Sequence, residues 1–216
     1  MGKIIAIDGP SGAGKSTIAK ALAEKLGFQY LDTGALYRAV GLALIELGLN
    51  PESGDGEIKK ALDGISIIFS DGHVFVNGED FTPRLRTKEA GHYSSVFSAR
   101  RPVREFLMPV QKAFAHSADI VAEGRDMGTV VFPNAWKKFF LDASTGERAG
   151  RRFRQMLATG KNITMEDAVE DVTERDNRDR ARDIAPLVAS PDAVYIDSTN
   201  IGPDEVIRKM LEEVAR

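Results

Sequence analysis

Residues 4–17 read Ile4-Ile5-Ala6-Ile7-Asp8-Gly9-Pro10-Ser11-Gly12-Ala13-Gly14-Lys15-Ser16-Thr17. The stretch contains the phosphate-loop pattern G-x-x-x-x-G-K-[ST], which begins at Gly9. The apolar run before the pattern has the length of a strand, and the apolar residues after it keep helical spacing as far as Gly27. Such a loop turns successive backbone N–H groups inward at the positive end of a helix. We therefore expect it to bind a nucleoside triphosphate through Gly9, Pro10, Ser11, Gly12, Ala13, Gly14, Lys15, Ser16 and Thr17.

Two residues of the loop carry specific chemistry. Lys15 is expected to reach the β- and γ-phosphates, and the Ser16 hydroxyl is expected to bind Mg²⁺. Two related motifs each fail by one residue: a nucleophile elbow would need glycine in place of Ala13, and a dinucleotide loop would need glycine in place of Thr17.

The composition indicates an ordinary globular protein that is large enough for one α/β domain with small insertions. The chain has 216 residues, of which 43% are hydrophobic and 28% charged. A formal net charge of −3 argues against a general nucleic-acid or membrane-surface binder. Of the 17 arginines, 12 lie between residues 100 and 182, which is typical of a protein that binds phosphate groups there.

The sequence contains no cysteine, so disulfides and thiol chemistry are excluded. We expect no signal peptide before the first expected strand, and no apolar run in the sequence approaches the ~20 residues of a membrane span. We expect a cytoplasmic protein that binds no membrane.

Strands and helices alternate along most of the chain, which predicts a parallel, doubly wound sheet. Residues 50–58 are turn-rich and polar. The short apolar runs that follow are separated by Asp71-Gly72 and Asn77-Gly78, both strong hairpin signals. We therefore expect a small antiparallel sheet inserted into the α/β fold.

The second expected strand ends at Asp32, and a helix is expected to start at Thr33. Thr33 suits the N-cap of that helix, and it equally suits a functional role. Asp32 could orient a Mg²⁺-bound water or simply start the turn. Two other acidic residues, Glu123 and Asp142, also lie at expected strand ends, and either could be the acidic residue associated with the metal.

Phosphoryl transfer requires a donor loop, a second anion site and positive charge on the transferred group. The second site could use Arg38, Arg104 and Arg125. Arg125 is the most informative of these, because it follows an apolar strand directly and lies between Gly124 and Gly128. Each arginine could instead be an ordinary solvated residue.

Three arginines share one face of an expected helix, since Arg148, Arg151 and Arg152 have i, i+3, i+4 spacing. Their like charges would repel one another unless an anion joined them. The polar segment Thr159-Gly160-Lys161-Asn162 follows, so we expect a flexible lid over the triphosphate. The alternative is a solvated helix face.

A later helix carries Arg175, Asp179 and Arg182 along one stripe, with Asp176 and Arg180 as a second i, i+4 pair. A surface ladder of salt bridges explains this spacing without any function. Equally, an aspartate between two arginines could accept a ribose hydroxyl while the arginines bind phosphate.

Four segments together resemble the bacterial cytidylate kinase family: Gly-Pro-Ser-Gly-Ala-Gly-Lys-Ser (9–16), Leu-Asp-Thr-Gly-Ala-Leu-Tyr-Arg (31–38), Glu-Gly-Arg-Asp-Met-Gly-Thr-Val-Val-Phe-Pro (123–133) and Glu-Arg-Asp-Asn-Arg-Asp-Arg (174–180). The first segment is shared by many kinases, whereas the third and fourth are far more specific. The resemblance covers nearly the full length and includes the hairpin-rich insert near residues 62–86. Thr33 stands where the family often has serine, so the hydroxyl is retained.

The resemblance implies transfer of a phosphoryl group from ATP, with Mg²⁺, to CMP or dCMP. It implies a P-loop fold with a core at about 1–32, 100–147 and 163–216, a monophosphate-binding insert at about 33–99 and a helical lid at about 148–162. It also implies a monomer whose partners are these small molecules and not nucleic acid.

The resemblance assigns roles to individual residues. The catalytic residues would be Lys15, Arg125, Arg148, Arg152 and Arg178. Ser16 would hold the metal, and Asp32, from its position at the strand end, is expected to contact the metal through water. The CMP site would comprise Thr33, Arg38, Ser95, Arg104, Arg125, Asp126, Arg175, Asp179 and Arg182.

Two other functions are compatible with the phosphate loop alone. A small-molecule kinase of the shikimate type shares the loop but has no obvious need for the hairpin insert. A P-loop regulator or binding module would bind ATP without a second small substrate.

Overall fold

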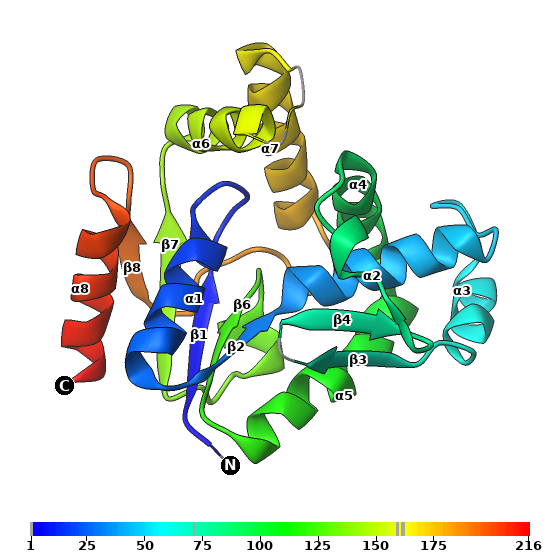
Figure 1. Ribbon diagram of the computed structural model, residues 1–216, viewed down its shortest axis with the longest axis horizontal. Coiled ribbons are helices and arrows are strands. Elements are labelled where there is room, and N and C mark those ends of the chain that lie inside the picture. The colour runs from blue at the N-terminus through cyan, green and yellow to red at the C-terminus, as the bar shows by residue number, and fades with distance from the viewer. Residues whose placement is uncertain (1, 71, 159, 161–162) are drawn as a thin grey trace. The chain divides into compact units, whose positions relative to one another are not determined.

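The computed structural model describes residues 2–70, 72–158, 160 and 163–216 (Figure 1). The chain divides into two compact units. One contains Lys3–Tyr30 and Asp119–Arg216, and the other contains Leu31–Ala118. We call them the sheet unit and the insert unit.

The sheet unit is built on five strands in the order β2-β6-β1-β7-β8. The strands are β1 (Ile4–Asp8), β2 (Gln29–Asp32, whose last two residues belong to the insert unit), β6 (Ile120–Glu123), β7 (Lys137–Asp142) and β8 (Val194–Asp197). The pairs β1–β6, β1–β7 and β7–β8 are all parallel. Every residue of β1 is buried, as expected for an apolar strand with neighbours on both sides. The predicted parallel α/β sheet is confirmed.

Strand β1 lies between two strands that follow it by more than a hundred residues in the chain. Ile7 is in register with Glu123 of β6, and Asp8 is in register with Phe140 of β7. The segments that leave β1 and β6 therefore start side by side at the carboxyl edge of the sheet. In open α/β sheets this edge, at the point where the strand order reverses, is where ligands bind.

Four α-helices complete the sheet unit: α1 (Lys15–Leu26), α6 (Thr145–Ala158), α7 (Met165–Arg180) and α8 (Pro203–Val214). Helix α1 ends at Gly27, whose φ of 67° permits the left-handed C-cap. Helices α1 and α8 pack on each other, and α6 packs on α7, as Figure 1 shows beyond the end of β7. A short π-helical turn, Met127–Val131, follows β6 and was not predicted.

The insert unit contains helices packed with a small sheet. Its helices are α2 (Thr33–Glu46), α3 (Asp55–Leu62), a 3₁₀ turn (Thr82–Arg84), α4 (Lys88–Phe97) and α5 (Arg101–Ser117). Its strands β3 (Ile67–Ser70), β4 (His73–Val76) and β5 (Glu79–Asp80) form an antiparallel sheet, which confirms that prediction. Asn77 and Gly78 take left-handed φ values of 50° and 85°, as a tight hairpin requires. Asp71, in the other expected hairpin turn, lies outside the described residues.

One expectation about the insert unit needs correction. Helix α3 lies partly in the stretch that we expected to be turns; only Ile58 and Leu62 are buried on this short helix, so its apolar pattern was too weak to indicate a helix. The compact unit runs to Ala118, because α5 packs against α2 and α3. The assignment of core, monophosphate-binding insert and lid remains a prediction, and lid residues 159, 161 and 162 lie outside the described residues.

In the part of the chain that the structure describes, no helix has both the length and the apolar character needed to cross a membrane.

Candidate active site

The phosphate loop connects β1 to α1, and its glycines are required by close packing. Gly9, Gly12 and Gly14 have φ values of 151°, 77° and 94°. A Cβ on Gly9 would lie 2.0 Å from the Leu141 carbonyl oxygen, and a Cβ on Gly12 would lie 2.8 Å from the Arg148 carbonyl oxygen. Strand β7 and helix α6 therefore leave no room for a side chain at either position.

Helices α6 and α7 bind the tip of this loop. The amide of Ser11 donates to Asp176 Oδ1 at 3.2 Å, and Arg148 Nη1 donates to the Ser11 carbonyl at 3.0 Å. Arg151 Nη1 donates to the Ala13 carbonyl at 3.0 Å. The loop's conformation thus depends on side chains that come from the segment around the predicted lid.

Lys15 lies at the amino end of α1 with only 5% of its surface exposed. Its Nζ donates to the Pro10 carbonyl at 2.8 Å. Burial and the neighbouring Arg125 lower the pKa of Lys15 to about 7, against the opposing effects of Glu123, Asp179 and Asp8. A phosphate group placed beside this amine would favour its charged form, so the environment suits an anion.

Arg125 and Arg182, both partly buried, form an ion-pair network around the buried carboxylate of Asp179. Arg125 Nε donates to Asp179 Oδ2 at 2.7 Å, and Arg182 Nη2 donates to Asp179 Oδ1. Burial by itself would raise the pKa of Asp179, but the two arginines outweigh it and hold the pKa below its usual value. Both oxygens of Asp179 are therefore bound to guanidinium groups, and its two arginine partners come from different segments of the chain.

Arg175 lies next to this network and has a surplus of positive charge around it. Burial and Arg125 lower the pKa of Arg175 to about 10. The Nε atoms of Arg175 and Arg182 are buried and have no hydrogen-bond partner among the described residues. An anion bound here would both satisfy donors and reduce the repulsion between cations.

The three arginines of the predicted lid each have an acidic partner. Arg148 pairs with Asp176, Arg151 Nε contacts Glu147 Oε1 at 2.9 Å, and Arg152 Nε contacts Asp171 Oδ2 at 2.9 Å. We expected that only a bound anion would relieve the repulsion between these arginines. In the structure, carboxylates of the protein relieve it as well.

The solvated-face alternative is wrong for Arg148, which is only 3% exposed. Asp176, expected to pair with Arg180 along α7, pairs instead with Arg148 on α6. Arg178 is partly exposed, and its Nη2 lies 3.6 Å from Glu174 Oε2. The catalytic roles of Arg148, Arg152 and Arg178 remain predictions.

Of the remaining residues expected to bind CMP, Asp126 lies in the sheet unit and is 2% exposed, and the others lie in the insert unit. The N-cap of α2 is Asp32, which accepts from the Ala35 amide at 2.8 Å and from Arg38 Nη2 at 3.1 Å. The expectation that Thr33 is the cap is therefore wrong, and Thr33 is instead the first residue of the helix, buried to 2% exposure.

Ser95 and Arg104 are also buried in the insert unit. Ser95 Oγ has no hydrogen-bond partner within the described part of the chain, which leaves it available to a ligand. Arg104 Nη1 donates to the Ser98 carbonyl at 3.2 Å, and its guanidinium lies over the Tyr37 ring, 5.7 Å from the centroid.

Of the two residues expected at the metal, Ser16 fits Mg²⁺ chemically. Ser16 lies in the first turn of α1, is partly exposed and offers a hydroxyl oxygen, the type of ligand that Mg²⁺ accepts. Asp32 is committed to the α2 cap and to Arg38. Of the two strand-end acids left open, Glu123 accepts from Tyr30 Oη at 2.6 Å and Asp142 from Tyr195 Oη at 3.1 Å. Among the described residues, no group of three or more histidine or acidic side chains is arranged to hold a metal.

Two acidic residues of this site were not assigned a role from the sequence. Asp8 accepts from the amides of Met127 and Gly128, at 2.8 and 2.7 Å. Asp176 was considered only as part of a surface ladder. The available signal for Asp8 was its position at the end of a fully apolar strand, immediately before the first glycine of the loop. Spacing alone gave no comparable signal for Asp176.

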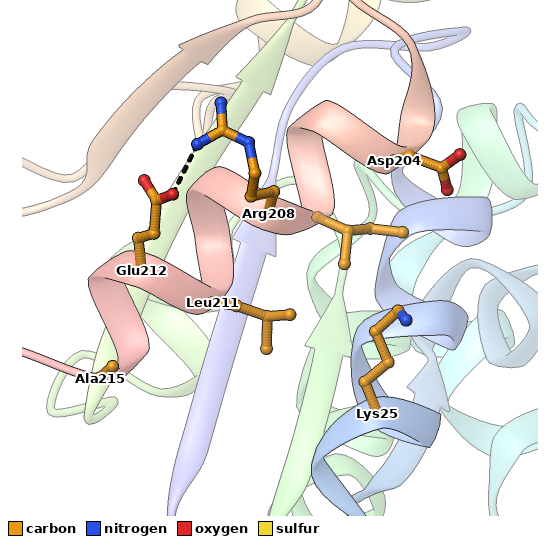
Figure 2. Close-up of a pocket in the computed structure, with 7 residues that line it drawn as sticks. Lys25, Asp204, Arg208, Leu211, Glu212 and Ala215 are labelled. Atoms are coloured by element: carbon orange, nitrogen blue, oxygen red, sulfur yellow. Dashed lines mark hydrogen bonds and ion pairs between the residues drawn. The ribbon is translucent and has the colours of Figure 1, made fainter.

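A separate open groove of about 510 Å³ lies between α1 and α8. It is lined by Lys25, Asp204, Ile207, Arg208, Leu211, Glu212 and Ala215. Figure 2 shows Arg208 turned along the helix toward Glu212, with which it forms an ion pair. None of the predicted site residues lines this groove.

Comparisons with known proteins identify the family of the chain. The profile of the cytidylate kinase family matches residues 5–216. The chain is 51% identical over 222 residues to a cytidylate kinase of Thermodesulfovibrio yellowstonii, covering 100% of this chain and 99% of that protein. It is 44% identical over 214 residues to a cytidylate kinase of Vibrio vulnificus, covering 98% and 95% of the two chains.

Among solved structures, a shikimate kinase from Bacteroides thetaiotaomicron superposes with a TM-score of 0.50 at 16% identity, covering 99% of each chain. This likeness concerns the fold alone, and it agrees with the P-loop kinase architecture expected from the sequence. The full-length match and the high identity to the relatives show more than the fold: the chain belongs to the cytidylate kinase family.

Proposed function

We propose that this protein transfers the γ-phosphoryl group of ATP to CMP or dCMP, forming ADP and CDP or dCDP. The observation that carries the proposal is a cluster of cations at the phosphate loop, of which Lys15 is buried and Arg125 and Arg175 are partly buried, in a chain of the cytidylate kinase family. Lys15, Arg125 and Arg175 lie close enough for Arg125 to lower the pKa of the other two. Phosphate groups of the two nucleotides would compensate this charge.

The chain contributes positioning and charge, which are the main requirements of phosphoryl transfer. The backbone amides of the loop would bind the phosphates of ATP, and Lys15 would stabilise the charge that develops on the transferred group. Arg125 would lie at the acceptor phosphate, oriented by its bond to Asp179. Ser16 and, through water, Asp32 would hold Mg²⁺, and the metal would supply positive charge for the phosphates of ATP.

We propose that CMP is bound by the residues that the resemblance assigns to it. Asp126 is 2% exposed, so it would read the base away from competing water. Ser95 Oγ, which is buried and has no partner among the described residues, would bind the same nucleotide. We further propose a cytoplasmic monomer that binds neither nucleic acid nor membranes. Sedimentation at several protein concentrations tests whether the protein is a monomer.

The direct test is coupled ADP release with ATP, Mg²⁺ and a panel of acceptors: CMP, dCMP, UMP, AMP and shikimate, with a no-acceptor control. We expect rapid turnover with CMP or dCMP. Turnover with shikimate would instead support a small-molecule kinase. ATP binding without acceptor-dependent turnover would support a regulatory P-loop module. Omitting Mg²⁺ in the presence of a chelator tests whether turnover requires the metal.

A further inference from the structure

The segment that carries Arg125 and Asp126 ends in the π-helical turn Met127–Val131. The Val131 amide donates to the Asp126 carbonyl at 3.1 Å, and the Phe132 amide donates to the Met127 carbonyl at 2.7 Å. The first amides of any helical turn have no partner inside it and need a cap. An aspartate immediately before a helix usually provides that cap itself, yet the side chain of Asp126 does not.

Asp8 provides the cap from a distant part of the chain. Its Oδ1 accepts from the Met127 amide at 2.8 Å, and its Oδ2 accepts from the Gly128 amide at 2.7 Å, across a sequence separation of about 120 residues. Asp8 is 4% exposed, so water does not compete for these bonds. Bonds from amides to an ionised carboxylate are about twice as strong as neutral ones.

We propose that Asp8 is a positioning residue for the nucleoside monophosphate: by capping the turn in place of Asp126, it fixes Arg125 and Asp126 relative to Gly9, the first residue of the phosphate loop. This inference rests on the proposed function, in which Arg125 and Asp126 contact the acceptor. It adds a residue that does not itself touch the nucleotide.

An aspartate fits this geometry, although burying its negative charge is unfavourable. The Met127 and Gly128 amides donate to different oxygens of Asp8, and of the side chains this short only a carboxylate offers two acceptor oxygens. Burial raises the pKa of Asp8 to about 6, with Asp126 adding to the rise, while the bonds from Gly128 and Met127 and the charge of Lys15 oppose it. The ionised form of Asp8 is therefore unfavourable for folding at this buried position.

Asp8→Asn is the main test, since it keeps the size of the side chain but places an NH₂ group against one of the amides. With ATP saturating, we expect KM for CMP to rise about tenfold, the effect of losing one hydrogen bond to a charged group. With CMP saturating, KM for ATP stays within about twofold. The melting temperature changes little, because the substitution also removes a buried charge.

Asp119→Asn is the matched control. Asp119 Oδ1 accepts from the Lys3 amide at 2.6 Å, and the residue precedes β6, at the opposite edge of the sheet from Asp8. The same chemical change there should leave both KM values unaltered.

Gly128→Ala disturbs the contact between Asp8 and Gly128 in a second way. A Cβ on Gly128 would lie 3.3 Å from Asp8 Oδ2 and 3.2 Å from Lys138 Cδ, so it presses on the carboxylate without removing it. We expect KM for CMP to rise in this variant, and to rise little further when Gly128→Ala is added to Asp8→Asn. Such non-additivity is the signature of two changes that act on one interaction.

The outcomes separate this inference from the proposed function. If the unmodified protein does not phosphorylate CMP or dCMP, the proposed function fails. Suppose that the unmodified protein does phosphorylate CMP or dCMP. If Asp8→Asn then lowers only kcat, or raises both KM values equally, Asp8 is merely structural and the inference is overturned. If Asp8→Asn does not fold, Gly128→Ala decides: an unchanged KM for CMP overturns the inference, and a selective rise supports it.

Discussion

Arg148 on α6 and Asp176 on α7 form a buried ion pair, and together they bind both the carbonyl and the amide of Ser11. Arg148 Nε also donates to the Ala143 carbonyl at 2.8 Å. The pair therefore joins two helices to the tip of the phosphate loop. The segment expected to close over ATP is therefore bound to the loop through Arg148, while Asp176 binds the same loop tip from α7.

Breaking this pair should destabilise the protein. Arg148→Ala leaves Asp176, which is 3% exposed, as a buried charge without its main partner. Loss of one member of a buried pair costs about 3–5 kcal/mol of unfolding free energy. Arg154→Ala is the control, because Arg154 is 67% exposed in its side chain and should contribute about 0–1 kcal/mol. Urea unfolding compares the two, and equal, small effects would show that the pair contributes little.

Lys15→Ala should abolish phosphoryl transfer and leave the fold intact. Removing a group that stabilises charge in the transition state typically costs a few kcal/mol of activation free energy. The fold should persist because the buried ammonium is unfavourable, as the lowered pKa of Lys15 indicates. Single-turnover rates and circular dichroism test both parts. Near-normal turnover in a folded variant would refute the role of Lys15 in transfer.

ATP binding should take up protons above neutral pH. With a pKa of about 7 in the unliganded protein, Lys15 is mostly neutral at pH 8 and charged at pH 6. Bound phosphates raise that pKa, so the complex holds more protons than the free protein at pH 8, and affinity weakens as pH rises from 7 to 9.

Calorimetry at pH 8 in buffers of different ionisation enthalpy measures this proton uptake directly. Lys15→Arg is the control, because arginine stays charged throughout the range. Uptake that is unchanged in this variant would assign the proton to another group.

Asp126 should select cytosine over uracil. A carboxylate only accepts hydrogen bonds, so it suits the exocyclic amino group of cytosine and opposes the carbonyl of uracil. A site built on such a bond can reject the wrong base by about 10⁴-fold. Asp126→Asn should narrow the preference, because the amide NH₂ can turn toward the uracil carbonyl. The ratio of kcat/KM for CMP to that for UMP is the measurement, and an equal ratio in both proteins would mean that Asp126 does not read the base.

Local patterns in the sequence were sufficient for much of this protein. The pattern from Gly9 to Ser16, the apolar strand before it and the helix ending at Gly27 identified the phosphate loop, because turns, strands and caps depend mainly on neighbouring residues. The same holds for the hairpin at Asn77-Gly78, and the alternation of strands and helices along the chain predicted the parallel sheet. The resemblance of four segments to one family was confirmed by the comparisons.

The partners of the charged side chains were decided only by the tertiary structure. Spacing placed Arg148 on one helix face with Arg151 and Arg152, but it could not show that α7 would bury that arginine against Asp176. Nor could it show that Asp8 would cap a turn about 120 residues away. The physical reason is that an ionisable group's energy depends on what faces it and on how much water remains, and both follow from how distant elements pack.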